Sequence, residues 1–506
     1  MENRYDAVVI GSGLGGLVSA LILAKNGYKV VVLEKNKQFG GNLQTFSRDK
    51  RIFETGVHYI GSLGEGEILN TYFKYLGIMD DLKIKKLDDE AFDVITFGDE
   101  KEEFYQAQGY DRFAKSLTNQ FPDEQEAITK YCLKVQEICK TFPLYNLNAD
   151  IRSYDMENLS IKLVDFLDSI TDNELLKAVL VGNNFLYAGD KETPFYVHAL
   201  SVNSYIESSW RCINGSSQIT KSLIKKIKEF GGEAYKHAEV TKIHFDKEEN
   251  KVTYVEVNGE QVFADKFISN IDPKYSIQLL DGNGFRNSYI KRVNKIKNTI
   301  SCFSLYIVLK PNTFKYQNRN YYHFKKVSKV FEAQDYSPNE WPDGYMVSMG
   351  VKPDHSEWGE SMTVLTYMRY DEMQSWEASF NTVSSEAERG RMYEAFKAQK
   401  SEALIKQLEE KFPNLRDCIQ SVYSSTPLSY RDYIGGADGN MYGYVKEADR
   451  VMECIISPKT RIPNFFFTGQ SLNMHGVVGV TIGAFLTCSY IVGMDSLIDD
   501  VKAYEL

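Results

Sequence analysis

The sequence has few of the features that mark secreted, membrane-spanning or metal-binding proteins. Its 506 residues include seven cysteines with no C-x-x-C pair, so we expect reduced thiols rather than a disulfide framework or a zinc site. No run of about 18 apolar residues occurs, so no membrane-spanning helix is expected. The N-terminus lacks the basic segment and long apolar run of a signal peptide. Together these absences favour a cytoplasmic protein.

Positive charge and common catalytic motifs are also scarce. The formal net charge is −10 and no dense Lys/Arg block occurs, so a nucleic-acid partner is not expected. The absence of G-x-S-x-G, H-E-x-x-H and P-loop motifs leaves hydrolase, zinc peptidase and NTPase functions without support, and we expect no metal. Aromatic residues are abundant instead. The 33 Tyr and 29 Phe suit large apolar clefts with hydroxyl groups at their edges, although a Tyr-rich surface would have the same composition.

The first forty residues have the pattern of a strand, a glycine-rich turn, a helix and a second strand. Residues 5–10 form a short apolar run typical of a buried strand, and Gly11-Ser12-Gly13-Leu14-Gly15-Gly16 fits G-x-G-x-x-G. A helix is expected over residues 17–26 and a second strand over residues 29–33, which ends at Glu34. This order predicts a nucleotide-binding βαβ unit at the start of the chain.

Each part of this unit has a physical role toward a dinucleotide. Gly11 permits the tight turn, Gly13 lets the backbone approach a pyrophosphate, and Gly16 lets the helix pack closely on the strand. The helix N-terminus offers free N–H groups to phosphate. Glu34 is spaced to accept hydrogen bonds from a ribose, and its carboxylate would repel a 2′-phosphate. The pattern therefore disfavours NADP and leaves NAD or FAD.

Two later segments favour a longer cofactor. A second glycine pair, in Phe39-Gly40-Gly41-Asn42, follows soon after the ribose acid and would let another loop approach the ligand. Residues 465–470 (FFFTGQ) predict a buried strand that ends in a polar turn. Residues 476–484 (GVVGVTIGA) then predict the opening of a final helix, whose N-terminus could face a second polar part of the cofactor.

These segments, together with residues 53–61 (FETGVHYIG), resemble the phytoene desaturase-type FAD flavoproteins. Within that family the retinol saturase and carotenoid isomerase branch is the most similar, because it shares an F-(D/E)-x-G-(I/V)-H-Y pattern. The resemblance implies an α/β protein with a discontinuous, glutathione-reductase-like Rossmann domain that binds FAD, and an inserted α+β substrate domain. The sequence departs from the family where Asn42 replaces a common Arg, where Glu54 replaces Asp, and at Asn214-Gly215 in place of a Gly-Gly pair.

The resemblance also implies which residues contact or border FAD. Carried over by position, these are Gly11, Ser12, Gly13, Leu14, Gly15, Gly16, Glu34, Lys35, Gly40, Gly41, Asn42, Gly56, Val57, His58, Val240, Gly469, Gln470, Gly479, Val480 and Thr481.

The length suggests about three domain-sized units. Asn258-Gly259 between two alternating runs predicts a hairpin inside the cofactor domain. Helices are expected over 125–142, 161–182 and 385–411, with a break at residues 194–198, and strands over 302–309 and 362–370. We therefore predict that residues 1–91, 212–286 and 425–506 form the FAD-binding domain. Residues 92–211 and 287–424 would form the substrate domain.

The implied function is an FAD-dependent oxidoreductase that saturates or desaturates a C–C bond of a hydrophobic polyene or isoprenoid, similar to a retinoid or carotenoid. Flavin N5 exchanges a hydride, so a proton donor is also needed, and His58, Tyr59 and His475 are the candidates. Alternatives are a flavin-dependent carotenoid isomerase without net redox, a non-catalytic flavin or lipid carrier, and an amine or other small-molecule oxidase. The expected partners are the hydrophobic substrate, a diffusing or protein electron carrier, and a membrane surface contacted peripherally.

Overall fold

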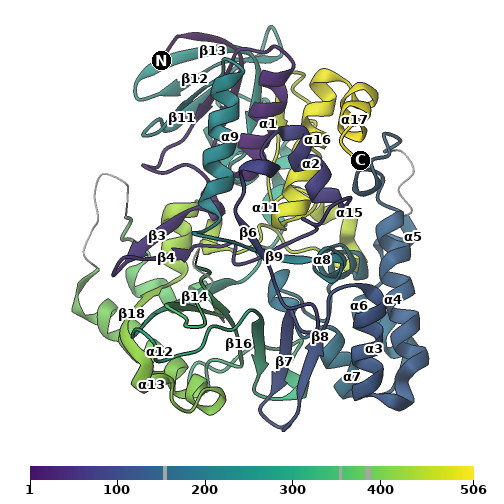
Figure 1. The fold of residues 1–506 in the computed structure, drawn as a ribbon. Coiled ribbons are helices and arrows are strands. Elements are labelled where there is room, and N and C mark those ends of the chain that lie inside the picture. The colour runs from purple at the N-terminus through teal and green to yellow at the C-terminus, as the bar shows by residue number, and fades with distance from the viewer. Residues whose placement is uncertain (152–155, 353–355, 382–388, 506) are drawn as a thin grey trace.

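The computed structural model describes residues 1–151, 156–352, 356–381 and 389–505, which are arranged around two seven-stranded sheets. In Figure 1 the first sheet lies in the upper half of the molecule beside the N-terminus, and the second lies in the lower half. Helices α3, α4, α6 and α7 pack together at the lower right, and α12 and α13 lie at the lower left. This is the predicted α/β fold class, with a Rossmann-type part and a second α+β part.

The first sheet has the strand order β10-β2-β1-β13-β12-β11, and β19 pairs with β13. Strands β10, β2, β1, β13 and β19 are parallel, whereas β11, β12 and β13 form an antiparallel meander. The β12–β13 hairpin turns at Asn258 and Gly259, which both have the positive φ of a primed turn, 52° and 83°. The strand bounds are β1 Arg4–Ile10, β2 Val30–Leu33, β10 Glu233–Tyr235, β11 Val240–Asp246, β12 Lys251–Val257, β13 Glu260–Ser269 and β19 Phe465–Phe467.

Helices α1 (Leu14–Lys25), α9 (Ser217–Glu229) and α16 (Gly476–Val492) pack beside one another on this sheet. Helix α1 begins three residues earlier than expected, at Leu14, because glycines 15 and 16 join its first turn. Both α1 and α16 are apolar on most sides, so they are largely buried rather than amphipathic. This places the N-termini of two buried helices at the carboxyl edge of the parallel strands.

The second sheet has the order β18-β14-β17-β16-β15-β7-β8 and combines strands from two distant parts of the chain. Strands β7 and β15 pair in parallel, and the other neighbours are antiparallel. The bounds are β7 Asp93–Phe97, β8 Glu103–Gln106, β14 Ser301–Leu309, β15 Asn320–Phe324, β16 Gly344–Met349, β17 Ser361–Met368 and β18 Ile419–Ser425. The exact boundaries of the two domains stay a prediction.

Smaller elements connect the two halves. Strand β9 pairs with β5 and β6, and β3 pairs with β4. Their bounds are β3 Thr45–Arg48, β4 Arg51–Glu54, β5 Ile60–Gly61, β6 Ile84–Lys86 and β9 Ser209–Cys212. The other α-helices are α2 Ile68–Leu76, α3 Tyr110–Gln120, α4 Gln125–Lys140, α5 Met156–Leu159, α6 Leu163–Ile170, α7 Glu174–Leu180, α8 Phe195–Glu207, α10 Pro273–Leu279, α11 Asn287–Lys295, α12 Gly390–Lys411, α13 Leu415–Cys418, α14 Pro427–Ser429, α15 Val451–Cys454 and α17 Met494–Lys502.

Two further local predictions need correction, and a third extends beyond the described residues. The helix expected over residues 161–182 is two helices, α6 and α7, because Asn173 caps the start of α7 with its side chain. The break expected at residues 194–198 is wrong for residues 195–198, which begin helix α8. Only Pro194 precedes that helix, and a proline is compatible with a helix start. Helix α12 begins at Gly390, and residues 385–388 of the helix expected there lie outside the described residues.

The remaining compositional expectations concern cysteine, metal and membrane. All seven cysteines are buried and free, as expected for core thiols. Within the ranges that the structure describes, no cluster of three or more metal-ligating side chains occurs. Across the same ranges, none of the helices combines the length and apolarity that crossing a bilayer requires.

Candidate cofactor and active site

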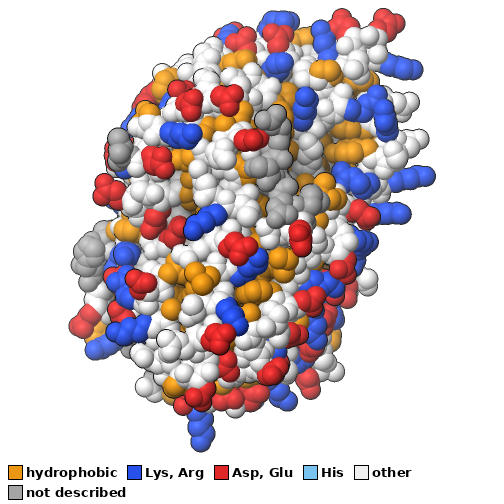
Figure 2. Space-filling model, turned by 90° about the vertical axis from the view of Figure 1, so that its right-hand side faces the viewer, with side chains coloured by type: hydrophobic (Ala, Val, Ile, Leu, Met, Phe, Trp, Pro, Cys, Tyr) orange, Lys and Arg blue, Asp and Glu red, His pale blue; other side chains and the backbone are white. Residues whose placement is uncertain are grey.

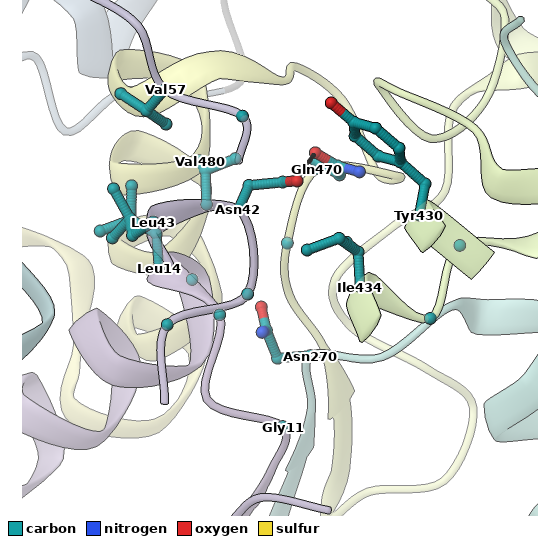
Figure 3. A pocket seen from close by; sticks show the side chains of 18 of the residues that line it. Gly11, Leu14, Asn42, Leu43, Val57, Asn270, Tyr430, Ile434, Gln470 and Val480 are labelled. Carbon is teal, nitrogen blue, oxygen red and sulfur yellow. Dashed lines mark hydrogen bonds between the residues drawn. The ribbon is translucent and has the colours of Figure 1, made fainter. Parts of the chain in front are cut away.

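A long pocket runs between the two sheets, at the carboxyl edge of the parallel strands. Its walls come from the turn after β1, the end of β2, the loops at residues 40–43 and 56–59, and the segments before α10 and around α16. Figure 3 shows Leu14, Leu43, Val57 and Val480 on one side, Tyr430 and Ile434 on the other, and Asn270 between them. This edge is where open α/β sheets bind ligands.

The two glycine turns form one close-packed cradle. Gly13 and Gly40 pair as an isolated bridge, and a Cβ added to Gly41 would lie 3.2 Å from the Gly13 Cα. A Cβ on Gly16 would lie 2.2 Å from the Gly11 carbonyl oxygen, so α1 can approach β1 this closely only with glycine at that position. Gly11 itself has a φ of 90°. The glycines thus leave backbone exposed to a ligand at the start of α1.

Glu34 holds these turns together. Its Oε2 accepts hydrogen bonds from the Ser12 amide (3.1 Å) and hydroxyl (2.5 Å), and its Oε1 accepts from the Asn36 amide (2.9 Å). The Ser12 hydroxyl in turn accepts from the Gly40 amide at 3.1 Å. Glu34 lines the pocket while it is 7% exposed, so it braces both turns and faces the space where a ribose would lie.

The pocket suits a cofactor with polar groups at several points. Thr468 lines it after β19, and its buried hydroxyl has no hydrogen-bond partner within the described chain. The N-terminal amides of α16 lack intrahelical partners, as in any helix, and point toward the same region. The Asn42 side chain donates to the Gln470 amide oxygen at 3.2 Å. These unsatisfied groups and the glycine cradle fit FAD, whose phosphates, ribityl chain and ring would supply the missing partners.

At the end of the pocket away from the glycine turns, aromatic and aliphatic side chains form a chamber. We call this part the aromatic chamber; it is lined by Tyr59, Phe185, Leu186, Tyr205, Tyr322, Met346, Leu365 and Tyr442. The Tyr59 hydroxyl donates to Asp93 Oδ2 at 2.9 Å and lies 2.7 Å from the Tyr322 hydroxyl. Burial raises the pKa of both phenols well above their usual value, so both are protonated.

The two candidate histidines lie in different places. His58 lines the pocket, and neither of its ring nitrogens has a hydrogen-bond partner among the described residues. His475 does not line it; its Nε2 lies 3.1 Å from the Leu186 carbonyl oxygen, and its ring packs on Tyr442. Burial lowers the pKa of each to about 4, and in His58 the charge of Arg211 adds to this effect. Both imidazoles are therefore neutral near pH 7.

Most of the residues that the sequence proposed for FAD line this one pocket: Gly11, Ser12, Gly13, Leu14, Gly15, Glu34, Lys35, Gly40, Gly41, Asn42, Gly56, Val57, His58, Val240, Gly469, Gln470 and Val480. Gly16 lies beneath the turn, Gly479 lines a neighbouring cavity, and Thr481 is fully buried with a hydroxyl that has no partner among the described residues. Their contacts with FAD stay predictions.

Sequence reasoning missed Asn270. Its side-chain amide crosses the glycine turn. Its Nδ2 lies 2.8 Å from the position that a Cβ on Gly13 would occupy, and its Oδ1 lies 2.7 Å from the position that a Cβ on Gly15 would occupy. The signal was available, since Asn270 directly follows β13, the parallel neighbour of β1, and so ends at the same sheet edge.

Comparison with known proteins agrees with this site. The chain is 27% identical to all-trans-retinol 13,14-reductase of Rattus norvegicus, over 99% of this chain and 88% of that protein. It is 26% identical to the chloroplastic prolycopene isomerase of Daucus carota, over 87% and 72% respectively. An oxidoreductase from Methanosarcina mazei has a similar fold, with a TM-score of 0.62, 15% identity and coverage of 95% of this chain and 98% of that one.

A family model described as "Flavin containing amine oxidoreductase" matches residues 14–282, which is more than half of the chain. That match spans most of the glycine cradle, Glu34, the loop of His58 and Tyr59, and the β12–β13 hairpin. The protein therefore belongs to the flavin containing amine oxidoreductase family and is an FAD-dependent oxidoreductase.

Proposed function

We propose that this protein saturates a C–C double bond of a hydrophobic polyene, of the retinoid or carotenoid kind. The observation that carries the proposal is the continuity of the site. The glycine cradle for FAD opens into the aromatic chamber, and the chamber adjoins a second, strongly apolar cavity of about 370 Å³. The two spaces share Leu186, Tyr205, Gly476 and Val477 in their walls. The likeness to a retinol reductase over nearly the whole chain supports the same reaction.

The second cavity has the lining that an extended hydrocarbon needs. Its walls are mainly aliphatic and aromatic, with Phe142, Leu144, Leu200, Ile455, Ile482 and Leu486 among them. Such walls exclude water and give a long apolar ligand its binding energy through burial, at roughly 25 cal/mol for each Å² removed from water. None of the described residues in this lining is an Asp, Glu, Lys or Arg, so a small charged amine would lack a counter-charge there.

In this mechanism bound FAD supplies the hydride that the reduction of a double bond requires. The chain's own residues hold the cofactor and the substrate and provide the proton. Of the three candidate donors, Tyr59 is protonated and lies at the chamber wall, 2.7 Å from the Tyr322 hydroxyl, through which its proton can pass to a substrate. His58 is neutral and offers one N–H, whereas His475 lines the apolar cavity and its ring stands against Tyr442.

The electron source and the route of the substrate are finer parts of this proposal. The sequence has one dinucleotide fingerprint, which supports a diffusing or protein electron carrier rather than a second bound nucleotide.

Met452 and Tyr490 line the apolar cavity and are 58% and 39% exposed, so we place a peripheral membrane contact at this rim. Figure 2 shows small apolar patches scattered among charged side chains on the face that it presents.

The test is to reduce the FAD-loaded protein anaerobically and add a panel of retinoids, carotenoids and isoprenoids. Saturation predicts that one class reoxidises the flavin at a rate that depends on substrate concentration, with a product heavier by two hydrogens. A product of unchanged mass with the flavin still reduced would instead support an isomerase, which the likeness to prolycopene isomerase favours as the alternative. If no compound reoxidises the flavin or changes, the catalytic proposal is wrong and a carrier role remains.

A further inference from the structure

Behind the aromatic chamber lies the buried carboxyl group of Asp93. Neither cofactor binding nor proton donation, as described above, gives this group a role. Asp93 begins β7 and is 0% exposed. It does not line the pocket, but its Oδ2 accepts the hydrogen bond from Tyr59, and Tyr59 contacts Tyr322. A carboxyl group buried this deeply is costly to ionise unless something compensates, so its position calls for a function or a partner.

The hydrogen bonds form a chain that leads from Asp93 to the chamber wall. Asp93 Oδ1 accepts from the Asn320 side chain at 2.8 Å, and Oδ2 accepts from Tyr59 at 2.9 Å and from Asn183 at 3.4 Å. Tyr59 and Tyr322 are 2.7 Å apart, and either hydroxyl could be the donor. Both tyrosines line the chamber, so the chain ends where a substrate would lie.

Such a chain has two directions, set by the protonation of Asp93. When Asp93 is ionised it can only accept, so Tyr59 donates to it, Tyr322 donates to Tyr59, and no hydrogen of the pair points into the chamber. When Asp93 carries a proton, it can donate to the Tyr59 oxygen, Tyr59 then donates to Tyr322, and the Tyr322 hydrogen is free to point outward. Only the second direction offers a proton to a substrate.

The groups around Asp93 hold its two states close in free energy. Burial raises its pKa to about 7, while the side chains of Asn320, Tyr59 and Asn183 and the charge of Arg211 act in the opposite direction. Arg211, on β9, reaches Asp93 through Asn320, to which its guanidinium donates. The other groups that face it are neutral: Tyr205 of α8, Tyr322 of β15, and Gln106 of β8, which accepts from Asn183.

We propose that Asp93 is a positioning residue that sets the direction of the Tyr59–Tyr322 hydroxyl pair and resupplies it with protons, so that Tyr322 delivers the proton that completes double-bond saturation. This deepens the proposed function and rests on it for the reaction, though not for the hydrogen-bond switch itself. Because reduction of the double bond needs a proton, the enzyme is active when Asp93 is protonated and the Tyr322 hydrogen points into the chamber. It is inactive when Asp93 is ionised and the Tyr322 hydroxyl donates to Tyr59.

The step balances in atoms and charge. Bound, reduced FAD would supply a hydride equivalent, two electrons and a hydrogen, to one carbon of the double bond, and Tyr322 gives its proton to the other carbon. Tyr322 regains a proton from Tyr59, and Tyr59 regains one from the Asp93 carboxyl group, which is left ionised. After the product leaves, water in the chamber returns one proton along the same chain.

The experiment has one arm that needs no turnover. In the apoprotein, infrared difference spectra between wild type and Asp93→Asn should isolate a protonated carboxyl band that disappears as pH rises through about 7. Raman bands that report hydrogen-bond donation by tyrosine hydroxyls can be assigned with Tyr59→Phe and Tyr322→Phe. In the wild type these bands should shift with the same pH midpoint as the carboxyl band. In Asp93→Asn they should not change with pH. A carboxyl band that does not titrate between pH 5 and 9, or tyrosine bands that ignore it, overturns the inference.

The second arm measures single-turnover reoxidation of reduced flavin by the active polyene against pH. The wild-type rate should fall about tenfold for each pH unit above the Asp93 midpoint, because only the protonated form donates. Asp93→Asn should react at least about tenfold more slowly at low pH and show no such fall. Tyr322→Phe should lose the same dependence while it keeps the carboxyl band, which provides the test if Asp93→Asn does not fold.

The matched control is Tyr131→Phe. Tyr131 is equally buried and lies 2.7 Å from His198 in another hydroxyl network, but it does not line the pocket. Its replacement should leave the pH profile unchanged. Reoxidation with a wild-type profile in Asp93→Asn would leave the proposed function standing and refute this inference. No reoxidation by any polyene, with both spectroscopic bands titrating together, would refute the function and retain the switch.

Discussion

The most direct test of the glycine cradle is Gly16→Ala, a change that adds one methyl group. In an ordinary helix position this substitution stabilises by about 1 kcal/mol, because alanine has the better helix propensity. In this protein the new Cβ would lie 2.2 Å from the Gly11 carbonyl oxygen and 3.1 Å from the Asn270 Cβ. Since real Cβ atoms essentially never approach closer than 3.0 Å, the turn and α1 would have to separate by most of an ångström.

Neither the turn nor the helix can move apart at a low cost in free energy. The Gly11 amide donates to the Leu33 carbonyl oxygen at 2.8 Å, and the helix residues around it are buried, so the turn and the helix are both fixed. Forced shifts in a packed interior cost roughly 1–3 kcal/mol, and the cradle would lose the geometry that receives the pyrophosphate. We therefore expect Gly16→Ala to destabilise the apoprotein by that amount and to weaken FAD binding by at least about tenfold, since each 1.4 kcal/mol is tenfold.

Urea unfolding of the apoprotein and fluorescence titration with FAD measure the two effects. The matched control is Gly483→Ala in α16, where an added Cβ meets no atom within 4 Å and the φ is ordinary. This control should be neutral or slightly stabilising in urea. If Gly16→Ala also proved neutral and kept wild-type affinity for FAD, the steric role assigned to Gly16 in the cradle would be refuted.

Three further predictions concern other parts of the site. Ser12→Ala should destabilise by roughly 1–3 kcal/mol in thermal unfolding, because Glu34 and the Gly40 amide both lose a buried partner; an unchanged midpoint would contradict the bracing role. Asp93 has a folded-state pKa raised from 3.8 to about 7, so wild-type stability should fall as pH rises between these values, by up to about 4 kcal/mol, and Asp93→Asn should remove that dependence in urea titrations at several pH values. Ile482→Trp should fill the apolar cavity and raise KM for a polyene without changing FAD affinity, and an unchanged KM would exclude the cavity as the substrate channel.

How much of the site the sequence can predict depends on how local each feature is. The β1–turn–α1 unit was predictable because its glycines, helix and strands follow one another within about thirty residues and each has its own periodic signal. The hairpin at Asn258-Gly259 was predictable for the same reason. The start of α1 was misjudged by three residues, since the glycine pattern alone does not say where the turn ends and the helix begins.

Features assembled from distant segments could not be predicted in this way. The sequence placed His475 only next to α16; in the fold its ring packs on Tyr442 and its Nε2 lies near the Leu186 carbonyl oxygen, so it lines the apolar cavity, and its role as an acid stays a prediction. Asp93 carried no signal at all, since a single Asp before an apolar run is typical of a strand beginning at the surface. Its burial arises only because β8 and β15 flank β7 in the folded sheet.

The register of β7 against β15 explains why a proton chain can exist at this place. The two strands are parallel, with Asn320 opposite Asp93 and Tyr322 opposite Ile95. Because side chains alternate along a strand, Asn320 and Tyr322 point to the same face, and Tyr59 approaches that face from the FAD-binding half. A slip of one residue would turn Tyr322 away from the chamber and leave Asp93 without its Asn320 donor. The same pairing that builds the substrate-side sheet therefore also places a buried acid two hydrogen bonds from the Tyr322 hydroxyl at the chamber wall.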